Sequence, residues 1–186
     1  MRKLTVFNHI SLDGYFVSGS GDMSWAHQGS DDAEYQAFVS NNASGDSEML
    51  FGRVTYEMMA GFWPTPIAHQ QMPVVADKMN NGRKVVFSHT LNNADWNNTK
   101  LVKGDLIEEV KRMKEDDGPD MVILGSGSIV AQLAAAGLID FYQVVINPVA
   151  LGAGRTLFEG LPQIMRMKLT NSRVFKNGKI FLTFGA

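Results

Sequence analysis

One stretch decides the fold: MVILGSGSIV, residues Met121–Val130. Its first four residues are apolar without a polar alternation, which predicts a strand buried on both faces. The glycines at 125 and 127 then predict a tight turn. Apolar residues at i, i+3, i+4 and i+7 from Val130 to Gly137 predict a helix that Gly137 ends in a left-handed cap. The stretch is therefore a strand-turn-helix unit.

Short runs rich in β-branched and aromatic residues predict further strands at Leu4–Ile10, Met49–Phe51, Lys84–Phe87, Lys100–Val102 and Tyr142–Val149. Two capping boxes, Asp31-Asp32-Ala33-Glu34 and Asp105-Leu106-Ile107-Glu108, predict helix starts among them. Because parallel neighbours need crossover connections, this alternation favours parallel strands joined by helices. The sequence predicts an α/β, three-layer fold with a central, mostly parallel sheet and helices on both faces.

The end of the chain differs from this pattern. Between Met167 and Phe184, two strand-like runs flank Lys176-Asn177-Gly178, and Asn-Gly supplies the positive φ angles of a tight hairpin. The sheet is therefore expected to be mixed, with an antiparallel C-terminal hairpin. We find no internal repeat and no linker, so residues 1–186 are predicted to form a single domain.

Composition restricts the possible partners. Apolar residues make up 45% of the chain and charged residues 19%, as in ordinary globular proteins. A net charge of −2 and a pI of about 6.1 argue against nucleic acid as a partner. No window approaches the roughly 20 apolar residues of a membrane-spanning helix. The absence of cysteine and of a signal-peptide pattern leads us to expect a cytoplasmic protein that does not bind membranes.

The turn at Gly125-Ser126-Gly127-Ser128 predicts an anion site. Glycines allow the backbone to approach a bulky anion, and the free N–H groups at a helix N-terminus stabilise its charge. The alternative is a tight strand-helix turn with serine caps and no ligand. The Rossmann fingerprint is not matched, since Val130 stands where the third glycine belongs and no acidic residue ends a strand about twenty positions further on.

Two other predicted strands end in polar residues that suit a phosphate. Gly52, Arg53 and Thr55 follow the strand at Met49–Phe51, and a guanidinium binds phosphate bidentately. Ser88 and His89 follow the strand at Lys84–Phe87. Because ligands of open α/β sheets bind beyond the carboxyl ends of the strands, we expect these residues to surround one anion.

Four motifs together resemble the dihydrofolate-reductase-like family, particularly the reductase domain of riboflavin biosynthesis and its small bacterial relatives. They are Ser11-Leu12-Asp13-Gly14, Gly52-Arg53-Val54-Thr55, Gly125-Ser126-Gly127-Ser128 and Asn147-Pro148-Val149-Ala150-Leu151-Gly152-Ala153-Gly154. The resemblance covers nearly the whole chain. As a set the motifs are specific, whereas none is specific alone.

The resemblance implies a site for NADPH and a small-molecule substrate. The residues it assigns to the cofactor are Arg53 and Thr55 at a phosphate, Ser88 and His89 near the ribose phosphate, and Gly125, Ser126, Gly127, Ser128 and Ile129 at the pyrophosphate. Those it assigns to the substrate are Asn8, Ser11, Asp13, Tyr15, Trp25, Asp31 and Arg155, with Asp13 and Asp32 as candidate catalytic carboxylates. A carboxylate that donates a proton there requires a pKa raised by burial.

Each carboxylate has a simpler alternative. Asp13 before a glycine is typical of a plain turn, and Asp31 or Asp32 is equally suited to be a helix N-cap. In folate reductases a first-helix carboxylate a few residues beyond a tryptophan binds the pterin, and Trp25 followed by these two residues resembles that arrangement. The four histidines, His9, His27, His69 and His89, show no metal-ligand spacing, so no metal site is expected.

The implied reaction is hydride transfer from NADPH to a heterocyclic or ribosylamino-pyrimidine substrate, as in 5-amino-6-(5-phosphoribosylamino)uracil reductase. The protein supplies orientation, and a carboxylate or an ordered water supplies the proton. Reduction of dihydrofolate is an alternative, although Ser-Leu-Asp-Gly favours the former. Further alternatives are a module that binds NADPH without turnover and a structural dimer whose glycine turn binds nothing. The resemblance also suggests a homodimer, formed through the C-terminal strands.

Overall fold

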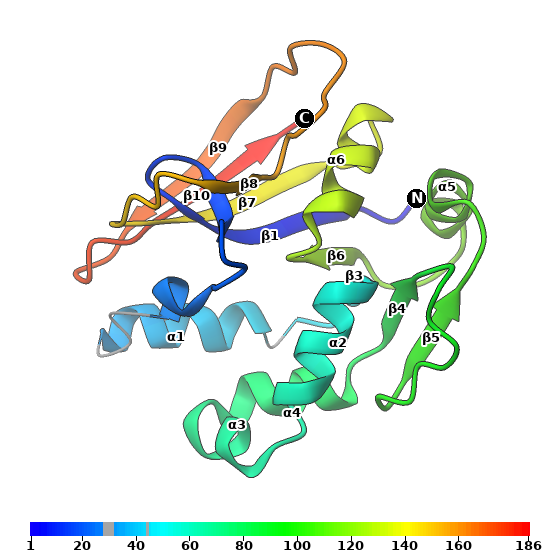
Figure 1. The fold of residues 1–186 in the computed structure, drawn as a ribbon, viewed down its shortest axis with the longest axis horizontal. Coiled ribbons are helices and arrows are strands. Elements are labelled where there is room, and N and C mark those ends of the chain that lie inside the picture. Colours follow the sequence, from blue (N-terminus) through cyan, green and yellow to red (C-terminus); the bar gives the residue numbers. More distant parts are fainter. Residues whose placement is uncertain (28–31, 44) are drawn as a thin grey trace.

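The computed structural model describes residues 1–27, 32–43 and 45–186. Within them, eight strands form one sheet in the order β5-β4-β3-β6-β1-β7-β10-β9 (Figure 1). The strands are β1 (Leu4–Ser11), β3 (Glu48–Gly52), β4 (Lys84–Phe87), β5 (Thr99–Val102), β6 (Met121–Leu124), β7 (Phe141–Asn147), β9 (Lys168–Val174) and β10 (Ile180–Gly185). The pairs from β5 to β7 are parallel, whereas β10 is antiparallel to both its neighbours.

Helices cover both faces of this sheet, as the figure shows. One face carries α1 (Ala33–Ala43), α2 (Arg53–Phe62), α3 (Pro66–Gln71) and α4 (Pro73–Asn81), and the other carries α5 (Leu106–Glu115) and α6 (Gly127–Ala135). Neighbouring strand residues accordingly belong to opposite layers: Leu50 packs in the cluster of α5 and α6, and Phe51 in that of α2 to α4. The predicted three-layer, mostly parallel fold is confirmed.

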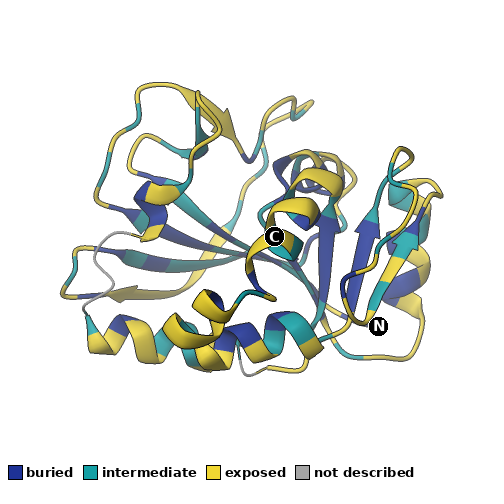
Figure 2. Ribbon diagram, turned by 60° about the horizontal axis from the view of Figure 1, so that its bottom comes forward, coloured by how far each residue is buried: buried dark blue, intermediate teal, exposed yellow. Residues whose placement is uncertain are grey.

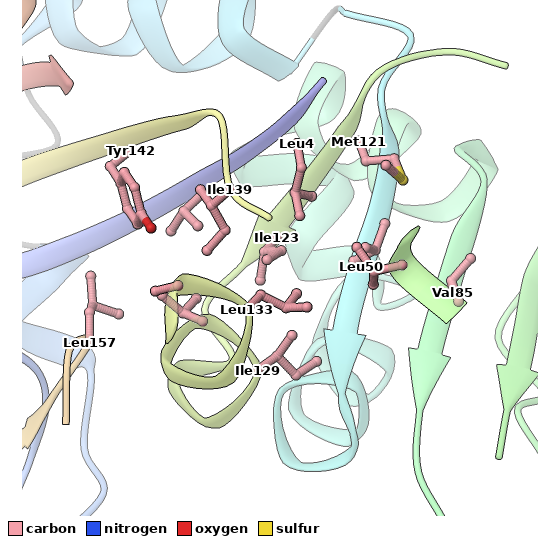
Figure 3. Close-up of a cluster of buried hydrophobic side chains, with 14 of the residues drawn as sticks. Leu4, Leu50, Val85, Met121, Ile123, Ile129, Leu133, Ile139, Tyr142 and Leu157 are labelled. Carbon is pink, nitrogen blue, oxygen red and sulfur yellow. The ribbon is translucent and has the colours of Figure 1, made fainter. Parts of the chain in front are cut away.

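The α6 layer shows how the sequence builds the core. Ile129 and Leu133, one helical turn apart, point from α6 toward Leu50 and Ile123 on the central strands (Figure 3). These side chains are at most 4% exposed. Burial of one such aliphatic side chain stabilises the fold by about 1.5–3 kcal/mol. Figure 2 shows the result, with buried strands in the middle and exposed outer helix faces.

Most predicted boundaries are confirmed. Asp105 caps α5 by accepting the N–H of Glu108 at 3.0 Å, and Gly137 follows α6 with φ of +66°. Of the two aspartates that could be the N-cap of α1, Asp32 caps the helix by accepting the N–H groups of Glu34 and Tyr35. Asp31 itself lies outside the described residues.

The α6 side of the molecule also carries a small feature that the sequence did not predict. Strand β2 (Tyr15–Ser18) pairs antiparallel with β8 (Gly154–Thr156) in a sheet of two strands. This sheet contacts the start of α6, since Phe16 packs directly against Gly127. Two strands of three and four residues, more than 130 positions apart, leave little local pattern in the sequence.

Candidate cofactor and substrate site

Most of the predicted site residues that the structure describes lie at the carboxyl edge of the parallel strands. There β3 leads into α2 at Arg53, β4 into Ser88, and β6 into the Gly125–Ser128 turn. The end of β1 lies beside the end of β7, where Ser11 is paired with Asn147. The fold therefore brings together segments spread over most of the chain.

Hydrogen bonds from β1, β3 and α2 fix the turn before α6. Gly125 and Ser126 both have left-handed backbones, with φ of 61° and 54°. The Ser126 N–H donates to Thr55 Oγ1 at 3.1 Å, and Ser126 Oγ accepts the N–H of Gly52 at 3.0 Å. Asn8 Nδ2 donates to the Gly125 carbonyl at 3.1 Å. Thr55, Ser126 and Asn8 thus hold the turn rigid.

The two glycines of the turn are required by packing within the protein. A Cβ on Gly127 would overlap the ring of Phe16, and one on Gly125 would lie 3.0 Å from the methyl of Thr55. We expected these two glycines to let the backbone come close to an anion. In the structure they instead let the backbone come close to the side chains of Phe16 and Thr55. Ile129 is also a core residue: its side chain is buried and its N–H donates to the Ser126 carbonyl.

Two helices begin at this edge without a side-chain cap, so the N–H groups of their first turns are not bonded by a capping side chain. Neither Gly52 before α2 nor Ser126 before α6 provides a side-chain hydrogen bond to the first turn. Asp32, Thr65 and Asp105 cap α1, α3 and α5, whereas α4 begins after Met72, also without a side-chain cap. The first N–H groups of α2 and α6, including those of Gly127 and Ser128, have no earlier carbonyl in their helix to accept them.

Basic and hydroxyl side chains lie next to these helix ends. Arg53 is half-exposed on the first turn of α2 and forms an ion pair with Glu57 at 2.8 Å, one turn later. Ser88 Oγ accepts the N–H groups of Thr90 and Leu91 at 3.2 and 3.0 Å, which tightens the turn after β4. His89 in that turn is exposed.

Asp13 stabilises the loop after β7. Its carboxylate accepts the Ser11 hydroxyl at 2.6 Å and the N–H groups of Leu151 and Gly152 at 3.0 and 2.7 Å. The Ser11 hydroxyl, then the Gly152 N–H, lower the pKa of Asp13 to about 2. This shift is opposite to the raised pKa that a proton donor requires, because all these donors favour the ionised form.

Asp32 is similarly occupied. Besides capping α1, its Oδ2 accepts the N–H of Asn177 at 3.0 Å, which ties the C-terminal hairpin to the helix. Desolvation, the largest single effect, favours a higher pKa for Asp32. The backbone N–H donors together outweigh it, so the pKa of Asp32 is lowered. The pKa shift expected of a catalytic acid is therefore absent here as well.

The remaining substrate candidates lie around the β2–β8 sheet. Ser11 accepts the N–H of Tyr15 at 3.0 Å and so fixes the start of β2. Trp25, in the short 3₁₀ helix η1 (Ser24–His27), is buried and donates Nε1–H to the Asp22 carbonyl. Arg155 on β8 is exposed, with its guanidinium 5.9 Å from the ring of Phe16. Because Phe16 rests on Gly127, Arg155 lies near the start of α6.

The sequence did not identify a second group of polar residues at this edge, on the face that carries α1. It consists of Asn147 at the end of β7, His9 on β1, Tyr35 on α1 and Lys179 before β10. Asn147 opens one of the four motifs of the resemblance but is given no role by it, and His9, Tyr35 and Lys179 each resemble an ordinary core or surface residue. The pairing of β1 with β7, which places His9 and Asn147 together, is not visible in the local sequence.

Neither a metal cluster nor a membrane span appears among the described residues. They contain no group of three or more His, Asp or Glu side chains able to hold a metal. No helix in the same ranges is long and apolar enough to cross a bilayer. A cavity of about 830 Å³ lies between α2, α4 and the segment before β5, where Asn80 and Trp96 line it, but none of the predicted site residues does.

Comparisons with known proteins agree with this architecture. Over 183 residues the chain is 25% identical to the uncharacterized protein YyaP of Bacillus subtilis (strain 168), covering 98% of this chain and 94% of that protein. Its fold is similar to the crystal structure of a putative riboflavin biosynthesis protein from Shewanella sp. PV-4, with a TM-score of 0.74 and 22% identity over 98% of both chains.

A third likeness is to a diaminohydroxyphosphoribosylaminopyrimidine deaminase/5-amino-6-(5-phosphoribosylamino)uracil reductase from Thermotoga maritima. The TM-score is 0.69 and the identity 14%, and the match covers 99% of this chain and 56% of that one. The family model of the RibD C-terminal domain matches residues 2–181. The chain therefore belongs to the RibD C-terminal domain family.

Proposed function

We propose that the protein is an NADPH-dependent reductase that transfers hydride to a small heterocyclic or ribosylamino-pyrimidine substrate, of the 5-amino-6-(5-phosphoribosylamino)uracil type. The observation that carries the proposal is the pair of uncapped helix N-termini of α2 and α6 at one sheet edge. The Gly52 N–H donates to Ser126 Oγ and so holds the two helix ends together. Each helix end attracts an anion by about 0.3–1 kcal/mol, and two phosphates of a dinucleotide suit the pair.

In this proposal the cofactor's phosphates bind at the two helix starts and after β4, where Arg53, Ser128 and His89 are exposed and Gly127 is buried. The N–H groups of Gly127 and Ser128 and the Ser128 hydroxyl take the pyrophosphate. Arg53 exchanges its ion pair with Glu57 for a cofactor phosphate. Ser88 and His89, at the end of β4, take the ribose phosphate. Gly125, Ser126, Thr55 and Ile129 act by holding the turn in shape.

The bound cofactor supplies the hydride, and the residues of this chain supply orientation and binding. Asp13 and Asp32 act as fixed anions that shape the substrate loop and the start of α1, because their pKa values are lowered. An ordered water, rather than either carboxylate, delivers the proton. Arg155 is positioned for an anionic group on the substrate. We also propose that the enzyme works in the cytoplasm as a homodimer.

Thermal unfolding of the purified chain with increasing NADPH tests the cofactor. At one hundred times its dissociation constant, NADPH should stabilise the fold by about 2.7 kcal/mol. Loss of NADPH absorbance with 5-amino-6-(5-phosphoribosylamino)uracil, and separately with dihydrofolate, tests turnover. Binding without oxidation of NADPH would indicate a non-catalytic module. Absence of any stabilisation would remove the cofactor proposal.

A further inference from the structure

The cavity between α2, α4 and the segment before β5 is separate from the cofactor and substrate residues described above. Its volume is about 830 Å³, a size that small-molecule ligands occupy, and Tyr56, Asn80 and Trp96 are among the residues that line it. Glu57 also lines it, and Glu57 is the ion-pair partner of Arg53. The cavity therefore shares one ion pair with the phosphate side of the proposed site.

The floor of the cavity is held in shape by hydrogen bonds within the protein. The main-chain N–H of Trp96 donates to the Tyr56 hydroxyl at 3.0 Å, and its indole N–H donates to Asn80 Oδ1 at 2.9 Å. Asn80 Nδ2 in turn donates to the Trp63 carbonyl at 2.9 Å. Trp96 and Tyr56 are 8% and 4% exposed. A ligand would therefore meet a preformed floor with aromatic edges.

The side chains around the cavity carry a negative charge. In the part of the chain that the structure describes, its lining holds the carboxylates of Glu57 and Asp95 and the ring of His69, but no lysine or arginine. The ammonium of Lys84 lies 4.6 Å from the ring of Trp96, but it is buried and donates to three carbonyls at the end of α4. Glu57 and Asp95 are exposed, so a cation in the cavity can reach both.

Glu57 connects the cavity to the phosphate side of the site. Its Oε2 lies 2.8 Å from Arg53 Nη1, one helical turn away on α2. When a cofactor phosphate takes Arg53, as proposed above, the Glu57 carboxylate loses its cation and can pair with a cation in the cavity. A cation in the cavity likewise frees Arg53 for a phosphate. Each ligand should therefore strengthen the binding of the other, and linkage makes the two effects equal.

We propose that this cavity is a second binding site, for an organic ammonium with an apolar body, and that Glu57 couples it to the cofactor site. The ammonium binds Glu57 and Asp95, and the apolar body packs on Ala60 and Pro64 beside Trp96. The site itself stands on the cavity and its charge. Only the coupling rests on the proposed function, since it needs a cofactor phosphate on the other side.

Proton–nitrogen NMR spectra of the full chain test the site, with phenethylamine as the probe and phenethyl alcohol as its uncharged counterpart. The indole N–H signal of Trp96 should move in a saturable manner, whereas that of Trp25, in η1, should not. We expect the amine to bind about fivefold more tightly than the alcohol, as one half-exposed ion pair allows. Asp95→Asn should weaken amine binding by a similar factor, whereas the matched control Asp117→Asn, on the exposed turn after α5, should not.

A Trp96 signal that does not move, equal affinities of the amine and the alcohol, or full amine affinity in Asp95→Asn would overturn the site. These titrations are run without NADPH, so their outcome does not depend on the proposed function.

The same titration with saturating NADPH tests the coupling. NADPH should tighten amine binding by about threefold to fivefold in the unmodified chain and by much less in Glu57→Gln. The amine should tighten NADPH binding by the same factor. An unchanged amine affinity with NADPH, or an equal gain in Glu57→Gln, would overturn the coupling. If NADPH does not bind at all, the coupling is wrong together with the proposed function, and the amine titration still decides the site.

Discussion

Arg53 carries the sharpest prediction about the cofactor at the scale of one residue. Its guanidinium is half-exposed and held by Glu57, so a phosphate can replace the carboxylate. Arg53→Ala should weaken NADPH binding by about 1.5–3 kcal/mol, the contribution of a charge-assisted hydrogen bond. If Arg53 binds the ribose phosphate, NADH binding should change much less, which calorimetric titration of both cofactors would reveal.

The control for Arg53 is its own ion-pair partner. Glu57→Gln frees the guanidinium without removing it, so NADPH should bind equally or more tightly. Equal losses for NADPH and NADH in Arg53→Ala would place this side chain on the pyrophosphate. Unchanged binding of both cofactors would contradict the assignment of Arg53 to the site.

Asp13 gives a pH-dependent prediction. Its pKa is lowered from 3.8 to about 2, first by the Ser11 hydroxyl and then by the Gly152 N–H. A lowered folded-state pKa means that the carboxylate stabilises the fold above its usual pKa, and that this stability is lost as the pH falls through about 2. Asp13→Asn should therefore lower the melting temperature at neutral pH, with a difference from the unmodified chain that shrinks below pH of about 4.

Melting curves from neutral pH to about pH 2 check this expectation. Asp117→Asn, on the exposed turn after α5, serves as the control. A raised pKa for Asp13 would be seen as stability that increases as the pH falls from neutral through that pKa, and it would restore the proton-donor hypothesis that the hydrogen bonds now argue against.

At the scale of elements, one substitution at the start of α6 should change the stability of the fold and the affinity for NADPH in opposite directions. Ser128 is exposed on the first turn, where a negative side chain interacts favourably with the helix dipole by about 0.3–1 kcal/mol. Ser128→Asp should keep or raise stability, yet repel the pyrophosphate and weaken NADPH binding at least about tenfold, a loss of about 1.4 kcal/mol. Ala135→Glu, at the exposed last residue of α6, adds the same charge away from the phosphate and should bind nearly as before.

The contact between β2 and α6 gives a second prediction for elements. Because a Cβ on Gly127 meets the Phe16 ring, Gly127→Ala should destabilise the fold by about 1–3 kcal/mol. Adding Phe16→Leu should recover part of that loss in a double-mutant cycle measured by urea unfolding. Gly61→Ala on α2, where no atom lies within 4 Å of the added Cβ, is the control and should stabilise the fold by up to about 1 kcal/mol. A simple sum of the two single effects would mean that another neighbour requires this glycine.

These elements also show what the sequence could and could not predict. Local patterns sufficed for β6, for the Asp105 cap and for the hairpin at Asn177-Gly178, because each depends on neighbouring residues. Helices α3 and α4 were missed although Thr65-Pro66 and Pro73 mark their starts. The β2–β8 pairing and the polar cluster of His9, Tyr35, Asn147 and Lys179 depend on contacts between distant segments, which no local pattern records.

The same limit applies to the predicted site residues. Their common location at the sheet edge follows from the strand ends, which the sequence predicts well. Their individual tasks do not follow from the sequence. Thr55 accepts the N–H of Ser126, 71 positions away, and Asn8 donates to the carbonyl of Gly125, 117 positions away. Only the three-dimensional arrangement separates polar groups already satisfied within the protein from those available to a ligand.

At the scale of the whole molecule, the exposed edge of the sheet bears on the proposed homodimer. Strand β9 is the last strand of the order, all of its residues are exposed, and Leu169 and Val174 are 51% and 69% exposed. An edge strand with exposed apolar side chains readily pairs with another strand, and charges on it prevent such pairing. We therefore expect light scattering after size exclusion to give twice the 20.5 kDa mass of one chain.

The double variant Leu169→Lys and Val174→Lys should then have the mass of one chain, with an unchanged circular dichroism spectrum. Ile67→Lys, on α3 and 59% exposed, places the same charge on another apolar site and should leave the dimer intact. If the β9 variant remains dimeric while Ile67→Lys dissociates, the interface lies on the helical face. If the unmodified chain is a monomer, the homodimer proposal is wrong. The cofactor proposal is not affected by that result, because its residues lie at the carboxyl ends of the parallel strands and not on β9.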